Sequence, residues 1–460
     1  MASASSGNLH HQTRLRRWRN RVLGLVRQVT AAGAGRAAAT ALLIRIASAI
    51  LAYATQVILA RWMGRSDFGI YVYVWTWTLV FGDLVHFGLA YSAQRFIPEY
   101  TQNGRLDLLR GFLRSSRWFV ALAGTGIAAF GVSGLWAFQP RIDPAELLPL
   151  YLACATVPLY ALGNLSDGIA RTYNWVNLAL LPPYILRPAL IVALAIMAPL
   201  FGLAADAASG MGAAMIATWA TAIVQLRLLH RQLARTVEPG PRSYDPKGWA
   251  SVSFPIFLVF GFYTLFNYTD VIVLQFLRPS AEVATYFAAV KTLAPIAFIN
   301  FSVVAAVAHR FAEHHVAGAD DDQRRLLAQS IRATFWLSVA ALAGLLPLGW
   351  LMLRLFGPGF EEGYPLLFVL ALGLIARASV GPAERLLNMA GEQRRCTVIY
   401  ACAFATNLIA CIALIPHLHM YGAAAAVSLG QVVEATLLYL TVRRRLGLHA
   451  FVFFTPKPAP

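Results

Sequence analysis

Twelve apolar segments divide this chain, and each is about as long as a helix that crosses a membrane. A helical span of the ~30 Å hydrocarbon core takes about 20 apolar residues. Because no segment alternates apolar and polar residues with period two, helices are favoured over barrel strands. The sequence therefore predicts an all-α, polytopic membrane protein with about twelve transmembrane helices. The segments cover residues 37–60, 69–91, 117–138, 147–166, 178–201, 209–228, 252–276, 285–307, 333–355, 364–387, 397–416 and 421–442.

The charge of the chain follows the pattern of a membrane protein rather than that of a nucleic-acid-binding protein. Apolar residues make up 58% of the chain and charged residues 13%, with a net charge of +17. Soluble domains carry about 25% charged residues. If the N-terminus is placed in the cytoplasm, the inside segments hold 26 Lys and Arg residues and the outside loops hold 4. This positive-inside distribution predicts that both termini are cytoplasmic and explains the charge without nucleic acid.

One unit of the sequence occurs twice. The stretch Val57–Phe96 contains an apolar segment, a polar turn at Asp67 and a second apolar segment that ends in an Arg-Phe pair. The same order returns 215 residues later in Ile272–Phe311, without a gap, and Asp67 then falls on Glu282. Few positions are identical, so the inference rests on the matching order and spacing of the apolar segments, the polar turn and the Arg-Phe pair. The pattern predicts two related halves, as in many transporters.

The halves are separated by a proline-containing linker and flanked by two basic tails. The first tail has seven arginines and no acidic residue. It is interpreted as a cytoplasmic flank, although an amphipathic helix on an anionic leaflet or a transit peptide has a similar composition. The predicted divisions are a tail at 1–36, an N-terminal six-helix bundle at 37–228, a linker at 229–251, a C-terminal six-helix bundle at 252–442 and a tail at 443–460.

Three groups of short motifs resemble a known family. They are Leu59–Gly64 with Asp67–Tyr71, Phe87–Leu89 with Arg95–Tyr100, and Asn407–Ile409 with Leu414–Pro416 and Tyr421–Ala425. In this order and spacing, the chain resembles the bacterial polysaccharide (O-antigen and exopolysaccharide) flippases. These belong to the multidrug/oligosaccharidyl-lipid/polysaccharide (MOP) exporter superfamily. The resemblance covers about residues 37–445, and the chain has twelve predicted spans where some relatives have fourteen.

The resemblance implies a mechanism and partners that composition alone does not show. Two pseudo-symmetric six-helix bundles would surround a central cavity in the bacterial inner membrane. A lipid-linked oligosaccharide on a polyprenyl diphosphate would cross by alternating access. A proton or a sodium ion is expected as the coupling ion, because titratable side chains lie within the predicted spans. Membrane lipids, and a polysaccharide polymerase or glycosyltransferases, are the partners that this resemblance implies.

Eight ionisable side chains inside the predicted spans are candidates for the site. Each costs about 2.5–3.5 kcal/mol at the centre of a span, so such residues face a cavity or a partner. They can also form structural ion pairs or snorkel to the surface. Four could neutralise a diphosphate, namely Arg45, Arg187, Lys291 and Arg377. Four could bind the coupling ion, namely Asp83, His86, Asp270 and Glu434, and of these Asp83 and His86 are predicted to share a helix face.

Two alternatives remain at this stage. A drug or cation antiporter of the same superfamily would need a more acidic cavity, and the basic residues within the spans disfavour it. A membrane polymerase or ligase would need a large external loop, but the outside connections are short. We find no Walker loop and no nucleophile elbow, and the His309–His315 run has no zinc-motif spacing. The chain is therefore predicted to be a transporter rather than an enzyme, without a cofactor or a metal.

Overall fold

The computed structural model describes residues 33–296, 299, 303 and 320–454, and these residues form helices and short connections without any strand. Most of the 1–36 tail, the end of the 285–307 span, the His309–His315 run and residues 455–460 lie outside the described residues. The first half contains α2 (Gly33–Val85), α3 (Leu89–Gln102), α4 (Leu106–Phe138), η1 (Gln139–Arg141), α5 (Pro144–Thr172), α6 (Val176–Leu181), η2 (Pro182–Leu186), α7 (Arg187–Met197), η3 (Ala198–Phe201) and α8 (Ala207–Thr236). The second half contains α9 (Pro246–Leu277), α10 (Ser280–Leu293), α12 (Asp320–Phe356), η4 (Phe360–Gly363), α13 (Tyr364–Ala378), α14 (Ala383–Met389) and α15 (Gln393–Leu446).

The predicted all-α membrane fold is confirmed. Nine helical segments of the described chain are long and apolar enough to span a membrane. The first and last of them have 59 and 54 residues, far more than one span needs. Both are broken, at Gly64 in α2 and at His419 in α15, where the backbone has φ values of 79° and 56°. If each broken segment is counted as two spans, the nine segments become eleven. The described part of α10 adds the twelfth, so all twelve predicted segments are accounted for.

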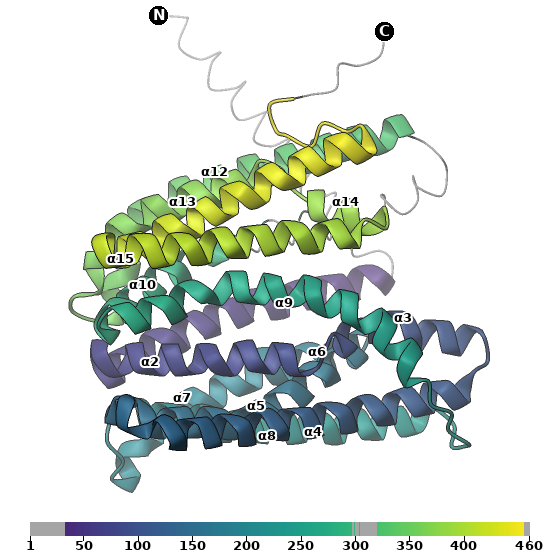
Figure 1. Cartoon of the computed structure of the whole chain (residues 1–460), viewed down its shortest axis with the longest axis horizontal. Coiled ribbons are helices and arrows are strands. Elements are labelled where there is room, and N and C mark those ends of the chain that lie inside the picture. The colour runs from purple at the N-terminus through teal and green to yellow at the C-terminus, as the bar shows by residue number, and fades with distance from the viewer. Residues whose placement is uncertain (1–32, 297–298, 300–302, 304–319, 455–460) are drawn as a thin grey trace, which may run out of the picture.

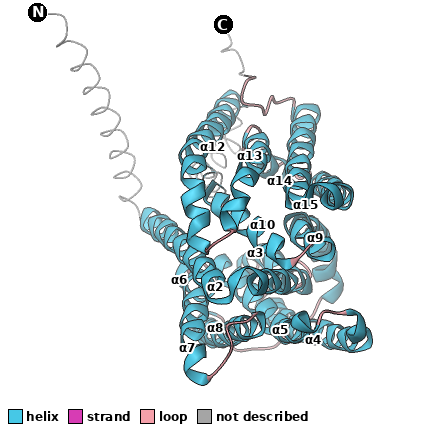
Figure 2. Ribbon diagram, turned by 90° about the vertical axis from the view of Figure 1, so that its left-hand side faces the viewer, coloured by secondary structure: helices cyan, strands magenta, loops and turns pink. Residues whose placement is uncertain are grey.

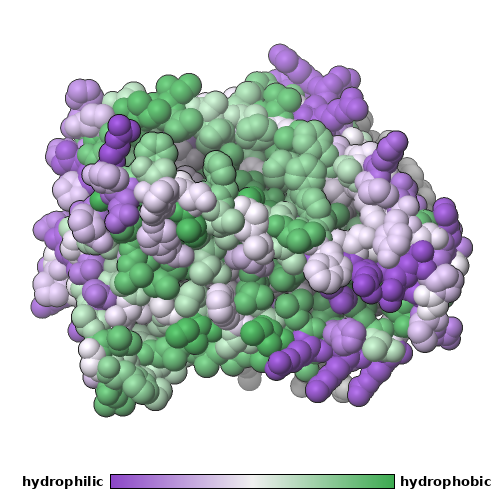
Figure 3. Space-filling model, turned by 60° about the horizontal axis from the view of Figure 1, so that its bottom comes forward, coloured by the Kyte–Doolittle hydropathy of each residue, from purple (hydrophilic) through white to green (hydrophobic). Residues whose placement is uncertain are grey.

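The helices run side by side along the longest axis of the molecule (Figure 1), and the view from the side shows them end-on in two groups (Figure 2). Helices α2 to α8 form one group and α9 to α15 the other, and the groups meet where α2 packs against α9 and α10. Hydrophilic residues gather toward the ends of the helices, and hydrophobic surface lies between (Figure 3). This belt is the surface that hydrocarbon would cover.

The two copies of the sequence repeat meet at one end of the bundle, which we call the turn end. Its centre is Phe68, a fully buried ring that lies 6.2 Å from Phe287 and 6.2 Å from Phe360, measured between ring centroids. Polar contacts surround this apolar centre, and Arg65 pairs with Glu362 at 2.8 Å. The N-terminal and C-terminal halves are therefore in direct contact at the turn end.

The halves also meet at the opposite end, which we call the linker end. The buried hydroxyls of Ser92 in α3 and Ser253 in α9 are 2.9 Å apart. The Trp249 indole donates a hydrogen bond of 2.9 Å to the Tyr100 hydroxyl. Helix α8 continues to Thr236 because Leu229 and Leu233 stay buried, so only the middle of the 229–251 linker is non-helical.

The segment after α15 folds back onto the second half instead of leaving it. The amide of Val452 donates to the carbonyl of Ser379 at 3.1 Å, and the side chains of Ala450 and Val452 are buried. The described part of the C-terminal tail therefore packs onto the break between α13 and α14.

The closest approach at the turn end gives a test of the packing. A Cβ at Gly69 would overlap the Ser280 carbonyl oxygen of α10. We expect Gly69→Val to destabilise the protein by about 1–3 kcal/mol, the usual cost of overpacking. Gly126→Val is the matched control, because nothing lies within 4 Å of a Cβ at that exposed helical position. The melting temperature in detergent should fall only for Gly69→Val, and equal melting temperatures would contradict the contact.

Candidate functional site

Arg187 is a cation held by aromatic rings in the N-terminal half. Its guanidinium carbon lies 5.0 Å from the ring centroid of Tyr160 and 5.7 Å from that of Trp75. Among the described residues it forms no ion pair. It follows the π-helical turn Pro182–Leu186, where two prolines interrupt the regular helical hydrogen bonds. Cation–π contacts of this kind are worth about 0.5–2 kcal/mol and do not form an ion pair, although the Asp83 carboxylate is within electrostatic range of Arg187.

Asp83 and His86 point to different partners, although their spacing predicts a common helix face. The Asn164 amide of α5 donates a 2.7 Å hydrogen bond to Asp83. The buried His86 accepts from the Gly88 amide through its Nδ1 atom at 3.2 Å. The reason is that α2 ends at Val85, so His86 lies in the turn that leads to α3. His86 supports this turn, and Asp83 belongs to the group around Arg187.

A charged pair that we did not predict lies beside Arg45. Asp167 and Arg171 of α5 are linked at 2.9 Å, and both are within electrostatic range of Arg45. The predicted span ended at residue 166, so these two residues were assigned to a connection. In the structure α5 runs on to Thr172. The sequence did contain a signal for this pair, because an acidic residue and an arginine are four residues apart next to the end of a predicted span.

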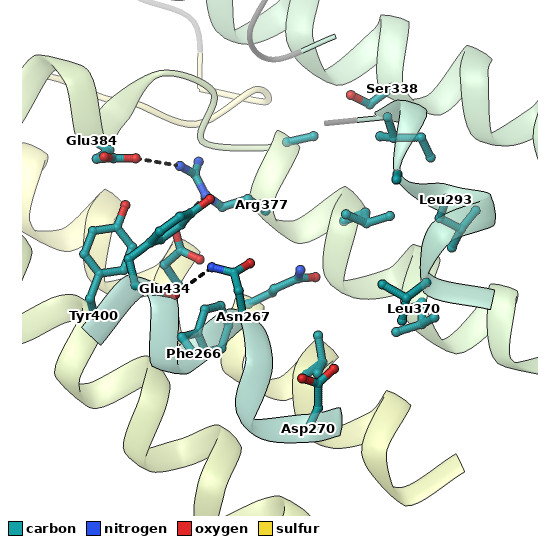
Figure 4. A pocket seen from close by; sticks show the side chains of 18 of the residues that line it. Phe266, Asn267, Asp270, Leu293, Ser338, Leu370, Arg377, Glu384, Tyr400 and Glu434 are labelled. Carbon is teal, nitrogen blue, oxygen red and sulfur yellow. Dashed lines mark hydrogen bonds and ion pairs between the residues drawn. The ribbon is translucent and has the colours of Figure 1, made fainter. Parts of the chain in front are cut away.

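The C-terminal half contains a cavity of about 560 Å³ between its helices, which we call the C-half cavity (Figure 4). All of its lining residues belong to α9, α10, the residues just after α10, α12, α13, α14, α15 and the α13–α14 break. The predicted residues Asp270, Arg377 and Glu434 are among them. The polar and aromatic lining residues are Phe260, Tyr263, Phe266, Asn267, Asp270, Tyr286, Thr334, Ser338, Arg377, Glu384, Arg385, Tyr400, Gln431 and Glu434.

Arg377 is neutralised by carboxylates on two other helices. Its Nε atom is 2.7 Å from Glu434 of α15, and its Nη2 atom is 3.5 Å from Glu384 of α14. Its Nη1 atom donates a 3.0 Å hydrogen bond to the Gly381 carbonyl. This geometry depends on the break between α13 and α14, where Gly381 has a φ of 52°. The structure thus joins a predicted substrate residue to a predicted ion-coupling residue.

Glu384 is the member of this group that sequence reasoning missed. It lies inside the predicted 364–387 span, seven residues after Arg377. Seven residues correspond to two helical turns, and opposite charges at that distance along one face were an available signal. The direct contact depends on the helix break, which the sequence signalled only through Gly381 and Pro382.

Asp270 and Lys291 lie near each other in the second half but have different partners. The Tyr286 hydroxyl donates to Oδ2 of Asp270, and Oδ1 is buried with no hydrogen-bond partner. The Lys291 ammonium lies 4.7 Å from the ring centroid of Phe287. Among the described residues Lys291 has no ion pair, so, like Arg187, it is a cation held against an aromatic ring. In the described part of the chain no cluster of three or more His, Cys, Asp or Glu side chains could hold a metal ion.

Two contacting groups of spanning helices, with buried charges and a cavity at membrane depth, define a multi-pass membrane transporter. Residues 151–455 match the family model of the lipid II flippase MurJ. The chain belongs to the lipid II flippase MurJ family, a family of transporters and not of enzymes. The superfamily predicted from the motifs is confirmed. The narrower assignment to O-antigen and exopolysaccharide flippases stays a prediction.

Solved structures of low sequence identity share the fold. The lipid II flippase MurJ in an inward closed conformation has a TM-score of 0.69 and 16% identity, covering 88% of this chain and 87% of that one. An inward-facing multidrug resistance MATE family transporter has a TM-score of 0.67 and 14% identity, covering 87% and 94%. A MOP superfamily transporter from Pyrococcus furiosus has a TM-score of 0.64 and 12% identity, covering 88% and 93%. No curated protein matches the sequence.

The buried ion pair gives a second test. Removing one partner of such a pair leaves an uncompensated charge and costs about 3–5 kcal/mol. We expect Arg377→Met to lower the melting temperature, and a second change, Glu434→Gln, to restore part of the loss. Arg95→Met is the control, because the Arg95–Glu99 pair is exposed and such pairs contribute about 0–1 kcal/mol. Additive effects of the two cavity changes would contradict the coupling.

Proposed function

We propose that this protein moves a lipid-linked glycan precursor, carried on a polyprenyl diphosphate, across the bacterial inner membrane by alternating access. The family supports a flippase that acts on a lipid-linked precursor. The observation that carries the proposal here is the presence of two cations, Arg187 and Lys291, which are held by aromatic rings. A diphosphate is a strong acceptor of charge-assisted hydrogen bonds, so it can bind these cations without first displacing a carboxylate.

The four predicted cations then have different parts in substrate binding. Arg187 and Lys291 are proposed as the first contacts of the diphosphate, one from each half. Arg45 lies beside the Asp167–Arg171 pair and would supply further positive charge in the N-terminal half. Arg377 would contribute only after its carboxylate partners are released. The two halves, 37–228 and 252–442, would rearrange around the bound ligand, with both termini in the cytoplasm.

For ion coupling we propose Asp270 as the first candidate. One of its oxygens is buried without a partner, whereas Glu434 is paired with Arg377, His86 supports a turn and Asp83 accepts from Asn164. A buried carboxylate with one oxygen unpartnered can bind a proton or a cation in order to offset its desolvation. The coupling ion would be a proton or sodium.

A drug or cation antiporter is the second candidate function. The C-half cavity has three carboxylates and two arginines in its lining, a balance that would suit a cation. Two of these carboxylates contact Arg377, however, and this reduces the attraction for a second cation. The third alternative, a polymerase or ligase, does not fit a family of transporters. A polymerase or glycosyltransferases remain proposed partners.

The cation proposal predicts a loss of transport. We expect Arg187→Ala and Lys291→Ala each to reduce flipping of lipid II in proteoliposomes by about tenfold, which equals 1.4 kcal/mol of lost binding free energy. Arg141→Ala is the control, because Arg141 also lies against a ring, that of Phe138, but is exposed in η1. Unchanged transport by the double variant Arg187→Ala/Lys291→Ala would contradict the proposal, and normal export of a cationic dye instead would support the antiporter.

The coupling proposal predicts a different phenotype. Asp270→Asn keeps the size of the side chain but removes its charge. We expect the variant to bind lipid II normally and to lose acceleration of transport by an imposed sodium or proton gradient. Asp206→Asn is the control, since Asp206 caps α8 through the Ser209 amide at the helix end. If Asp270→Asn keeps the full gradient dependence, Asp270 is not the coupling group.

A further inference from the structure

We propose that the C-half cavity is a sugar-binding subsite, which holds a sugar of the lipid-linked substrate while the diphosphate stays at Arg187 and Lys291. This inference rests on the proposed function and assigns different chemistry to two parts of the molecule. The cavity has about 560 Å³, within the ~300–1,000 Å³ of pockets that bind small molecules.

The charges of the cavity exclude the diphosphate from it. Asp270, Glu384 and Glu434 line it, and an anion would be repelled by them. Of the two lining arginines, Arg377 already contacts two of these carboxylates, and Arg385 is exposed. Placing the anionic diphosphate beside these carboxylates would cost free energy twice, because the diphosphate would lose its hydration and would also be repelled by the like charges. A neutral polar ligand avoids this cost.

Two side chains of the lining have polar groups that are at least partly accessible and that no described residue engages. Gln431 on α15 is half-buried and has no hydrogen bond among the described residues. Asn267 on α9 is exposed, and its side-chain oxygen has no partner among the described residues. Oδ1 of Asp270 and Oγ1 of Thr334 also lack partners, but these two atoms have almost no accessible surface, so a ligand in the cavity does not contact them. The groups that a ligand can contact therefore come from two helices, α9 and α15.

A sugar hydroxyl matches these groups because it both donates and accepts hydrogen bonds. It can donate to the Gln431 carbonyl or accept from its amide. Asn267 offers its side-chain oxygen, since its amide nitrogen donates to the Tyr263 carbonyl at 2.7 Å. Figure 4 shows Asn267, Asp270, Arg377 and Glu434 around one space.

Aromatic rings supply the other surface that a sugar needs. Tyr263, Phe266 and Asn267 share one face of α9 with Asp270, because they are three, four or seven residues apart. Tyr263 is 45% exposed, and its ring lies edge-on to Tyr400 at 5.3 Å between centroids. A partly exposed ring with a polar tip can cover the apolar C–H face of a sugar while its neighbours bond the hydroxyls.

The cavity also borders the contact between the two halves. Phe260 lines the cavity and stacks on Tyr91 of α3, with ring centroids 3.6 Å apart. Farther along the same helix, Tyr268 is within electrostatic range of Asp83 and Tyr160 in the N-terminal half. Helix α9 therefore presents one face to the C-half cavity and another toward the group around Arg187. A sugar joined to a diphosphate between the halves would meet the cavity along α9.

The test compares two lipids that share the polyprenyl diphosphate, of which only lipid II carries a disaccharide with its attached peptide. Purified full-length protein in nanodiscs of phosphatidylethanolamine and phosphatidylglycerol is titrated with lipid II and with undecaprenyl diphosphate. We expect the wild type to bind lipid II at least tenfold more tightly. The double variant Asn267→Leu/Gln431→Leu should lose this preference and keep its affinity for undecaprenyl diphosphate. Thr436→Val, an exposed change on α15, is the matched control.

The outcomes separate this inference from the proposed function. Equal binding of both lipids by the wild type, or an unchanged preference in the double variant, would show a merely hydrated cavity and overturn the subsite. If Arg187→Ala does not weaken the binding of undecaprenyl diphosphate, the proposed diphosphate site is wrong instead. Tyr263→Leu serves as a second variant if Asn267→Leu/Gln431→Leu does not fold, and it too should weaken only lipid II.

Discussion

Hydrocarbon offers no hydrogen bonds, and the architecture of this protein depends on that constraint. A backbone group left unpaired in the membrane costs several kcal/mol, so each span is helical and each break needs compensation. At the α13–α14 break, Arg377 donates to the Gly381 carbonyl, and Val452 donates to the Ser379 carbonyl. Two of the site's arginines lie at such interruptions: Arg377 contacts Gly381 and Glu384 at this break, and Arg187 directly follows the π-helical turn before α7.

The same constraint separates two kinds of buried cation. Arg377 is paired with carboxylates, so its charge is already used within the protein. Arg187 and Lys291 lie against aromatic rings, which stabilise a cation without cancelling its charge. An anionic ligand gains more binding free energy from a cation that lies against a ring than from one that is already ion-paired. On this ground we propose that the diphosphate binds the cations held by the rings of α2, α5 and α10, and that the C-half cavity takes neutral polar groups.

Sequence reasoning predicted the spans well because a span is a local property. About 20 apolar residues identify each one, and the break at Gly64 follows from a glycine in a short polar turn. It was less successful where a helix ends. Assigning Asp167 and Arg171 to a connection, and placing Asp83 and His86 on one face, both resulted from span limits that were wrong by a few residues.

The sequence by itself determined that the chain is an all-α membrane protein of two related halves, since hydrophobic length and the spacing of the repeat are written along the chain. Tertiary structure alone decided which charges are paired. Arg377 and Glu434 are 57 residues apart in the sequence and 2.7 Å apart in space. Their contact depends on how α13 packs against α15, and packing between helices is set by side-chain shapes from many positions at once, which no local pattern records.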